Sequence, residues 1–288
     1  VGSNESQSVT SNLFIGAKEV NTIKAYQRSL NIENFVDSVD WGWFFYLTKP
    51  IFYLLDWFNG FTNNMGWSII LLTLFIKTLL FPLSYKSFVS MSRMKHLQPQ
   101  MEKIKQNAGD DRAKLQQELM ALYKKEKVNP VAGCLPILLQ IPVFFSLYKV
   151  LFVTIEMRHA PFIGWIQDLS APDPTSFLNL FGLLPFSPPD PSSLFAIFSI
   201  GVYPILMGVT MWLQQKLNPA PTDKTQAMIF AWMPWVFMFM LGQFSAGLVI
   251  YWVANNLIQF GQQYIIMYSQ GVRPDIFGNI MQTFKRSE

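Results

Sequence analysis

The sequence predicts an all-α polytopic membrane protein in which five transmembrane helices surround a hydrophilic groove. Composition is the first reason: of 288 residues, 51% are hydrophobic and only 14% are charged, whereas a soluble domain carries about 25% charged residues. The second reason is that five segments approach the roughly 20 mostly apolar residues that a membrane-spanning helix needs. The third is the uneven placement of Lys and Arg between those segments, which is typical of a defined membrane topology.

Composition also excludes other classes of protein. Disordered chains have low hydrophobicity and high charge, and this chain has neither. A single Cys excludes a disulfide framework and a Cys-based metal cluster. The first 40 residues contain no apolar run of the kind found in a signal peptide. We therefore expect further sequence to precede Val1.

Five apolar segments are predicted to be the membrane spans. They occupy residues 61–85, 130–155, 194–213, 227–243 and 244–268. The fourth is the shortest, because its apolar run extends only from Ala227 to Leu241. Pro204 lies inside the third.

Residues 41–60 are predicted to form an amphipathic helix in the outer membrane interface. Nine aromatic side chains lie between Trp41 and Phe58. Lys49, Pro50 and Asp56 interrupt this run, so the segment is too polar to cross the bilayer. Aromatic side chains concentrate where lipid headgroups meet water.

Residues 86–129 are predicted to form a helical hairpin that turns at Gly109–Asp111, where an Asp can cap the second helix. Leu115, Leu119 and Leu122 form one apolar stripe on that helix, and Met91 and Met94 are among the apolar residues of the first arm. The stripe has two interpretations. It packs the two arms together, or Met91, Met94, Leu115 and Leu119 form an exposed surface that recruits nascent chains or partner proteins.

Charge placement sets the predicted orientation. Residues 86–127 contain ten Lys or Arg and five acidic residues, whereas residues 156–190 contain one Arg and four acidic residues. Because Lys and Arg are enriched in cytoplasmic loops, the hairpin is predicted to be cytoplasmic and residues 156–193 to be external. Alternation then makes 214–226 a cytoplasmic loop and 269–288 a cytoplasmic tail, and it places residue 1 outside.

Lys77 is the strongest candidate functional residue, because it falls about midway along the first predicted span. A cation inside the bilayer is unfavourable by at least about 2.5–3.5 kcal/mol, and it normally faces a protein-lined, hydrated space. The spans offer no Asp or Glu near its depth. Lys149, seven residues before Glu156, is instead expected to reach the outer headgroups.

Other polar span residues are predicted to line the same space. Thr73 lies one turn before Lys77 on the same helix face. A polar stripe on the last span has two explanations, groove lining and hydrogen bonding between helices. With an unpaired Lys77, a water-filled groove explains it better. The predicted substrate-binding residues of the groove are Lys77, Thr73, Gln140, Tyr251, Trp252, Asn255 and Gln259.

We find no catalytic constellation in the sequence, so an enzyme is not expected. His96 and His159 fall on opposite sides of the membrane by the charge argument, and no HExxH motif is present. The stretch Gly242–Gly247 (GQFSAG) joins two spans and is interpreted as a turn rather than a nucleophile elbow. No metal site and no cofactor are predicted.

Several stretches of the chain are similar to known proteins. They are KTLLFPL (77–83), MSRMKHLQP (91–99), LMALYKKEKVNPVAGCLPILLQIPVFFSLY (119–148), PFIGWIQDLS (161–170) and SAGLVIYWVANNL (245–257). In this order they resemble the YidC/Oxa/Alb membrane protein insertases, and most closely the type found in Gram-negative bacteria. The resemblance implies that residues 1–40 are the tail of a periplasmic domain.

The resemblance further implies a multi-pass protein of the bacterial inner membrane, with its C-terminus in the cytoplasm. It implies a groove that draws in the short acidic tail of a nascent membrane protein, passes the tail outward and releases the apolar segment into lipid. Lys77 corresponds to the groove cation of the family, where Arg is usual, and Trp252 stands where Tyr is common. Implied partners are nascent membrane proteins, the lipid bilayer, the Sec translocon, the ribosome and the signal-recognition pathway, with no direct contact to nucleic acid. The alternative is an anion channel or transporter that uses Lys77.

Overall fold

The all-α prediction is confirmed by a computed structural model, which describes residues 8, 11, 13–109, 111–129, 133, 135–189, 193–219 and 223–272. Within these ranges the regular structure is entirely helical. The α-helices are α1 (Val20–Ser29), α2 (Phe45–Thr62), α3 (Met65–Leu79), α4 (Phe81–His96), α5 (Gln98–Ala108), α6 (Arg112–Lys125), α7 (Leu135–Val153), α8 (Val202–Leu217), α9 (Lys224–Leu241) and α10 (Ala246–Ser269).

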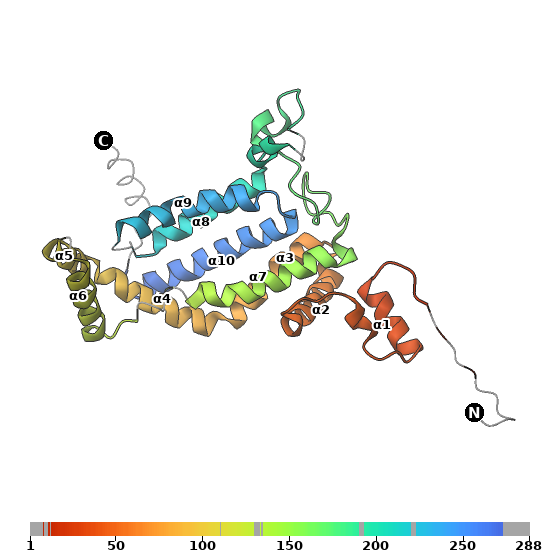
Figure 1. Ribbon diagram of the computed structural model, residues 1–288, viewed down its shortest axis with the longest axis horizontal. Coiled ribbons are helices and arrows are strands. Elements are labelled where there is room, and N and C mark those ends of the chain that lie inside the picture. The colour runs from red at the N-terminus through yellow and green to blue at the C-terminus, as the bar shows by residue number, and fades with distance from the viewer. Residues whose placement is uncertain are drawn as a thin grey trace.

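α10 is the central helix of the bundle, and it contacts α3, α4, α7 and α8. α9 packs on α8, and α2 packs on both α3 and α7. The α5–α6 hairpin lies at one end of the bundle, whereas α1, α2 and the long connection between α7 and α8 lie at the other end (Figure 1). The largest buried cluster joins residues of α2, α3, α7 and α10, so the core sits on the α2 side of α10.

The first predicted span, 61–85, is divided between helices. α3 ends at Leu79, α4 begins at Phe81, and the two helices are bent by 69°. Pro82 explains the break, because proline has no N–H and its ring clashes with the carbonyl of the preceding turn unless it starts a new helix. No single helix among the described residues is long and apolar enough to cross a membrane, although α3 and α4 together satisfy both criteria.

The third predicted span, 194–213, also differs from the structure. A short 3-10 helix (Leu194–Phe198) precedes α8, which begins only at Val202 and puts Pro204 in its first turn. Side chains of the preceding loop accept hydrogen bonds from the first N–H groups of α8. Val202 N donates to Thr175 Oγ1 (3.0 Å), and Tyr203 N donates to Asp173 Oδ2 (3.0 Å). These bonds fix the start of the helix, because its first N–H groups have no partner within the helix.

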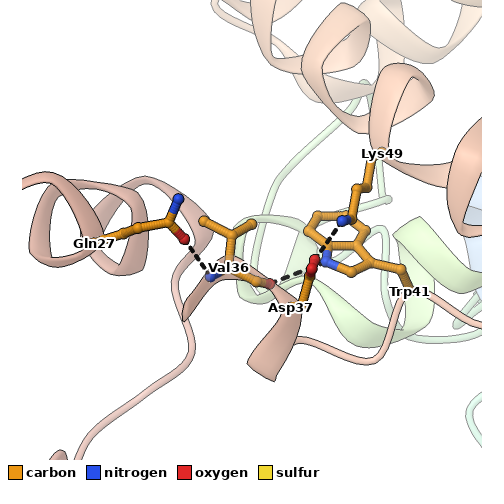
Figure 2. Close-up of polar contacts among 5 residues, drawn as sticks. All are labelled: Gln27, Val36, Asp37, Trp41 and Lys49. Carbon is orange, nitrogen blue, oxygen red and sulfur yellow. Dashed lines mark hydrogen bonds and ion pairs between the residues drawn. The ribbon is translucent and has the colours of Figure 1, made fainter. Parts of the chain in front are cut away.

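Polar contacts link parts of the N-terminal segment to one another and join it to α2 (Figure 2). Gln27 accepts a hydrogen bond from Val36 N, and Trp41 Nε1 donates to the carbonyl of Val36. Asp37 pairs with Lys49 of α2.

Asp40 pairs with Lys149 of α7. An exposed partner at this end of α7 is compatible with the expectation that Lys149 reaches the outer headgroups, which stays a prediction. The hydrogen bond from Lys149 lowers the pKa of the Asp40 carboxyl below its ordinary value. The segment before α2 is thus joined to two helices of the bundle by charge pairs.

We predict that Gly66→Ala destabilises the fold. A Cβ on Gly66 would lie 2.1 Å from the ring of Phe162, which must then move. Overpacking of this kind lowers the free energy of unfolding by about 1–3 kcal/mol. Gly60→Ala in α2 is the matched control, because a Cβ there meets no atom within 4 Å. Thermal unfolding in detergent should show a lower midpoint for Gly66→Ala and an unchanged or higher one for Gly60→Ala. Equal unfolding midpoints for the two variants would contradict the close packing of Gly66 in α3 against Phe162 in the connection after α7.

Candidate functional site

Lys77 is buried at the meeting point of three helices. Its side chain is on α3 and is only 7% exposed. Lys77 Nζ donates to Gln259 Oε1 on α10 (2.8 Å) and to Gln140 Oε1 on α7 (3.3 Å). None of the ion pairs formed within the described ranges includes Lys77. The ammonium is therefore held by neutral acceptors, with no carboxylate to balance its charge.

Gln140 links the cation to Tyr251. Its amide nitrogen donates to the hydroxyl of Tyr251 on α10, a side chain that is 2% exposed. An ammonium can only donate, so each glutamine must turn its amide oxygen toward Lys77. This requirement fixes the orientation of Gln140 and leaves its nitrogen free to reach Tyr251. The result is one chain of hydrogen bonds from Gln259 through Lys77 and Gln140 to Tyr251.

Asn255 lies on the same face of α10, one turn from Tyr251 and one turn from Gln259. It is 5% exposed, and its Oδ1 is buried with no hydrogen-bond partner among the described residues. An unpaired buried acceptor is unfavourable by about 1–3 kcal/mol. The site thus contains an acceptor that its own side chains leave unused.

Thr73 is buried in α3 one turn from Lys77, but its hydroxyl donates to the carbonyl of Ile69 in the same helix (2.7 Å). Trp252 points in another direction from Tyr251. Its ring packs against Phe144 of α7 (5.0 Å between ring centroids) and Phe237 of α9 (6.2 Å). The structure therefore places Thr73 and Trp252 beside the Lys77 cluster but outside its hydrogen bonds.

The polar stripe of α10 divides into two faces. Tyr251, Asn255 and Gln259 face the Lys77 cluster, whereas Asn256 donates to Thr210 of α8 (3.1 Å) and Gln263 donates to Asn218 just after α8 (3.0 Å). The second face joins α10 to α8, which is the helix-joining role that the sequence left open. Sequence reasoning did not find Thr210 and Asn218, because Thr210 is an isolated polar residue in an apolar segment and Asn218 belongs to the polar stretch of a predicted loop.

The predicted recruitment residues of the hairpin are packed rather than presented as an apolar surface. Leu119 belongs to a buried cluster between α5 and α6, against which Met94 and Leu115 pack. Met91 is 6% exposed and lies with Phe88 against Ile266 of α10. The facing sides of α5 and α6 are apolar, so these side chains pack against each other and are removed from water. Asp111 caps α6 by accepting from Lys114 N (3.0 Å), as the sequence predicted.

At the groove expected from the sequence, the structure shows a polar cluster in which Lys77, Tyr251 and Asn255 are buried while Gln140 and Gln259 are partly exposed. Lys77, Tyr251 and Asn255 are each at most 7% exposed. Cavities of about 500 Å³ and 270 Å³ lie elsewhere, the first beside Lys86 and Arg93 and the second beside Arg158 and His159. Solvent reaches the edge of the cluster at Gln140 and Gln259, whereas Lys77 itself lies behind them.

Two family models match the chain. One, described as 60Kd inner membrane protein, matches residues 57–272, which is most of the chain. The chain belongs to the 60Kd inner membrane protein family. The other, described as YidC periplasmic domain, matches residues 1–54, so the boundary between the two matches falls inside α2. Membership places the chain among bacterial inner membrane proteins.

Curated relatives in this family are named membrane protein insertase YidC. The protein of Roseobacter denitrificans is 68% identical over 281 residues, which cover 98% of this chain and 46% of the relative. That of Ruegeria pomeroyi is 66% identical over 286 residues, which cover 99% of this chain and 47% of the relative. The chain therefore spans about half the length of the curated relatives it matches.

A solved structure described as an active YidC insertase with its first transmembrane domain resolved is also similar. It is 25% identical, with a TM-score of 0.59, over 84% of this chain and 50% of that one. The resemblance to the YidC/Oxa/Alb insertases is thus confirmed by sequence and by fold.

We predict that residues 77 and 259 are energetically coupled. Gln259→Leu removes the shorter hydrogen bond of a buried ammonium, so it should destabilise the protein strongly. The same substitution in a Lys77→Met background should be less destabilising, with a coupling free energy of roughly 0.5–3 kcal/mol. Equilibrium unfolding in mixed micelles measures both values.

Asn256→Leu is the matched control on the same helix, because Asn256 bonds Thr210 on the other face of α10. Its effect on the free energy of unfolding should be the same with Lys77 or Met at position 77. Coupling of Asn256 as strong as that of Gln259 would show that the cluster is not a separate unit.

Proposed function

We propose that the chain is the membrane-embedded part of a membrane protein insertase and chaperone. It would move short acidic tails of nascent membrane proteins across the bilayer and release their apolar segments into lipid. The observation that carries this proposal is the buried Lys77, which has two amide acceptors and no carboxylate among the described residues.

The neutral partners of Lys77 suit transient binding of a carboxylate. Hydrogen bonds between two charged groups are stronger than those to a neutral amide, so an incoming carboxylate can displace Gln140 or Gln259 from the ammonium. A resident Asp or Glu would compete with the substrate, and the described residues supply none there. The amide groups of Gln140 and Gln259 remain available to take the tail's place on the ammonium, which favours release over capture.

The charge distribution supports a cytoplasmic hairpin and an external connection between α7 and α8. These two segments lie at opposite ends of the bundle (Figure 1). The 24 residues of α10 extend about 36 Å, which exceeds the roughly 30 Å of hydrocarbon in a bilayer. A membrane potential that is positive outside would pull an acidic tail outward by about 2.3 kcal/mol per charge per 100 mV.

The aromatic residues around α2 support contact with the outer interface. Trp43, Tyr46, Trp57 and Phe61 are each more than half exposed. Large exposed rings are typical of the level where headgroups meet water. We therefore propose that α2 lies in that interface.

The proposed partners are nascent membrane proteins and lipid, with the Sec translocon, the ribosome and the signal-recognition pathway as further candidates. The predicted cytoplasmic tail, 269–288, lies largely outside the described residues. An anion channel that uses Lys77 is not favoured, because the relatives are named insertases and Lys77 lines neither of the two cavities described above.

We predict that insertion depends on the charge at position 77. A substrate with a short acidic tail should insert into sealed proteoliposomes with wild-type protein and Lys77→Arg. It should insert poorly with Lys77→Ala and worst with Lys77→Glu. A charge pair about 4 Å apart is worth roughly 1 kcal/mol in bulk water and roughly 4 kcal/mol near a protein surface. Loss of the pair therefore corresponds to a decrease in insertion of roughly fivefold or more. Protection of the substrate from protease measures insertion.

A substrate with a neutral tail is the control, since its insertion should differ little among the four proteins. Equal insertion of the acidic substrate by all four would remove Lys77 from the mechanism. It would leave family membership untouched.

A further inference from the structure

The larger of the two described cavities lies away from Lys77, where α4, the segment after α6 and the end of α10 meet. Its volume is about 500 Å³. Three of its lining residues are cations, Lys86, Arg93 and Lys127, and no carboxylate lines it. Nothing in the role proposed for Lys77 uses this cavity.

The three cations have no counter-charge in the described parts of the chain. No hydrogen bond or ion pair joins the side chains of Lys86, Arg93 or Lys127 to another described residue. Lys86 and Arg93 are seven residues apart, two turns along one face of α4. Like charges brought together without acids repel one another, so the cavity favours an anion.

Lys127 is held at the cavity by an uncommon backbone conformation. Its φ of 51° lies in the left-handed region that favours glycine. Val128 N donates to Tyr123 O and Lys127 N to Lys124 O, which is the hydrogen-bond pattern of a Schellman helix end. Glycine is the usual residue at this position, and the lysine that occupies it here lines the cavity.

The surroundings of the cavity match a phosphate group near a membrane surface. Ser90, Asn129 and Gln270 add neutral polar groups, and the hydroxyl of Ser90 ties the loop to α4 by donating to Asn129 O (3.3 Å). Tyr85 lines the same cavity and lies beside Phe81 at the start of α4. Basic pockets beside interfacial aromatic rings are suited to the headgroups of anionic lipids.

We propose that this cavity binds a phosphate oxyanion, supplied by the headgroup of an anionic phospholipid in the cytoplasmic leaflet or by free phosphate. The lipid source rests on the membrane orientation given in the proposed function, whereas oxyanion binding does not. Lys86, Arg93 and Lys127 supply the charge, and the side-chain amide of Gln270 supplies a further donor.

Native mass spectrometry of the full chain in detergent tests the lipid source, with phosphatidylglycerol and phosphatidylcholine of identical acyl chains as probes. Phosphatidylglycerol should bind more tightly than phosphatidylcholine. Lys86→Gln/Arg93→Gln should weaken the binding of phosphatidylglycerol by about fivefold per lost charge. Lys103→Gln/Lys114→Gln is the matched control, since it lowers the net charge equally at exposed positions outside the cavity. Lys127→Gly removes the third charge while suiting the left-handed backbone, so it should weaken binding without unfolding the hairpin.

Titration with inorganic phosphate, followed by calorimetry, separates the two sources. One outcome is saturable phosphate binding that Lys86→Gln/Arg93→Gln loses and the control variant keeps, with no preference for phosphatidylglycerol. This outcome would assign the cavity to free phosphate. Absence of both kinds of binding, or an equal loss in the control pair, would overturn the proposal. Because these readouts do not depend on insertion of a substrate, a failure here is distinguishable from a failure of the proposed function.

Discussion

The centre of this protein depends on one constraint: the ammonium of Lys77 is buried, and no carboxylate of the described residues pairs with it. Lys77 must find acceptors inside the bundle, and it finds them 63 and 182 residues away in the sequence. Each acceptor comes from a different helix, so α3, α7 and α10 have to meet at this point. Because the glutamines are neutral, they accept two hydrogen bonds from Lys77 and leave its charge in place.

The central helix performs two tasks because its polar residues fall on two faces. One face holds the Lys77 cluster, and the other joins α10 to α8 through Asn256 and Gln263. The two sets of hydrogen bonds share no side chain, so the contacts with α8 do not depend on the members of the Lys77 cluster.

The break after α3 has a comparable effect on the charged part of the molecule. Pro82 ends the apolar helix that carries Lys77 and starts α4 at an angle of 69°. α4 then presents Lys86 and Arg93 beside the loop that follows α6. Pro82 thus separates the buried Lys77 from Lys86 and Arg93, which line the cavity together with Lys127.

The sequence by itself determined the helical class, the buried lysine and the hairpin turn, because apolar runs, an isolated charge and a capping Asp are local signals. It also supplied the motifs by which the family was recognised. Only the tertiary structure decided which polar residues of α10 meet Lys77, since residues 255 and 256 differ by about 100° around the helix and a sequence pattern does not say which neighbour each direction faces. The burial of Met91 and Leu119, the pairing of Lys149 with Asp40 and the late start of α8 were decided in the same way. Each depends on a partner far along the chain.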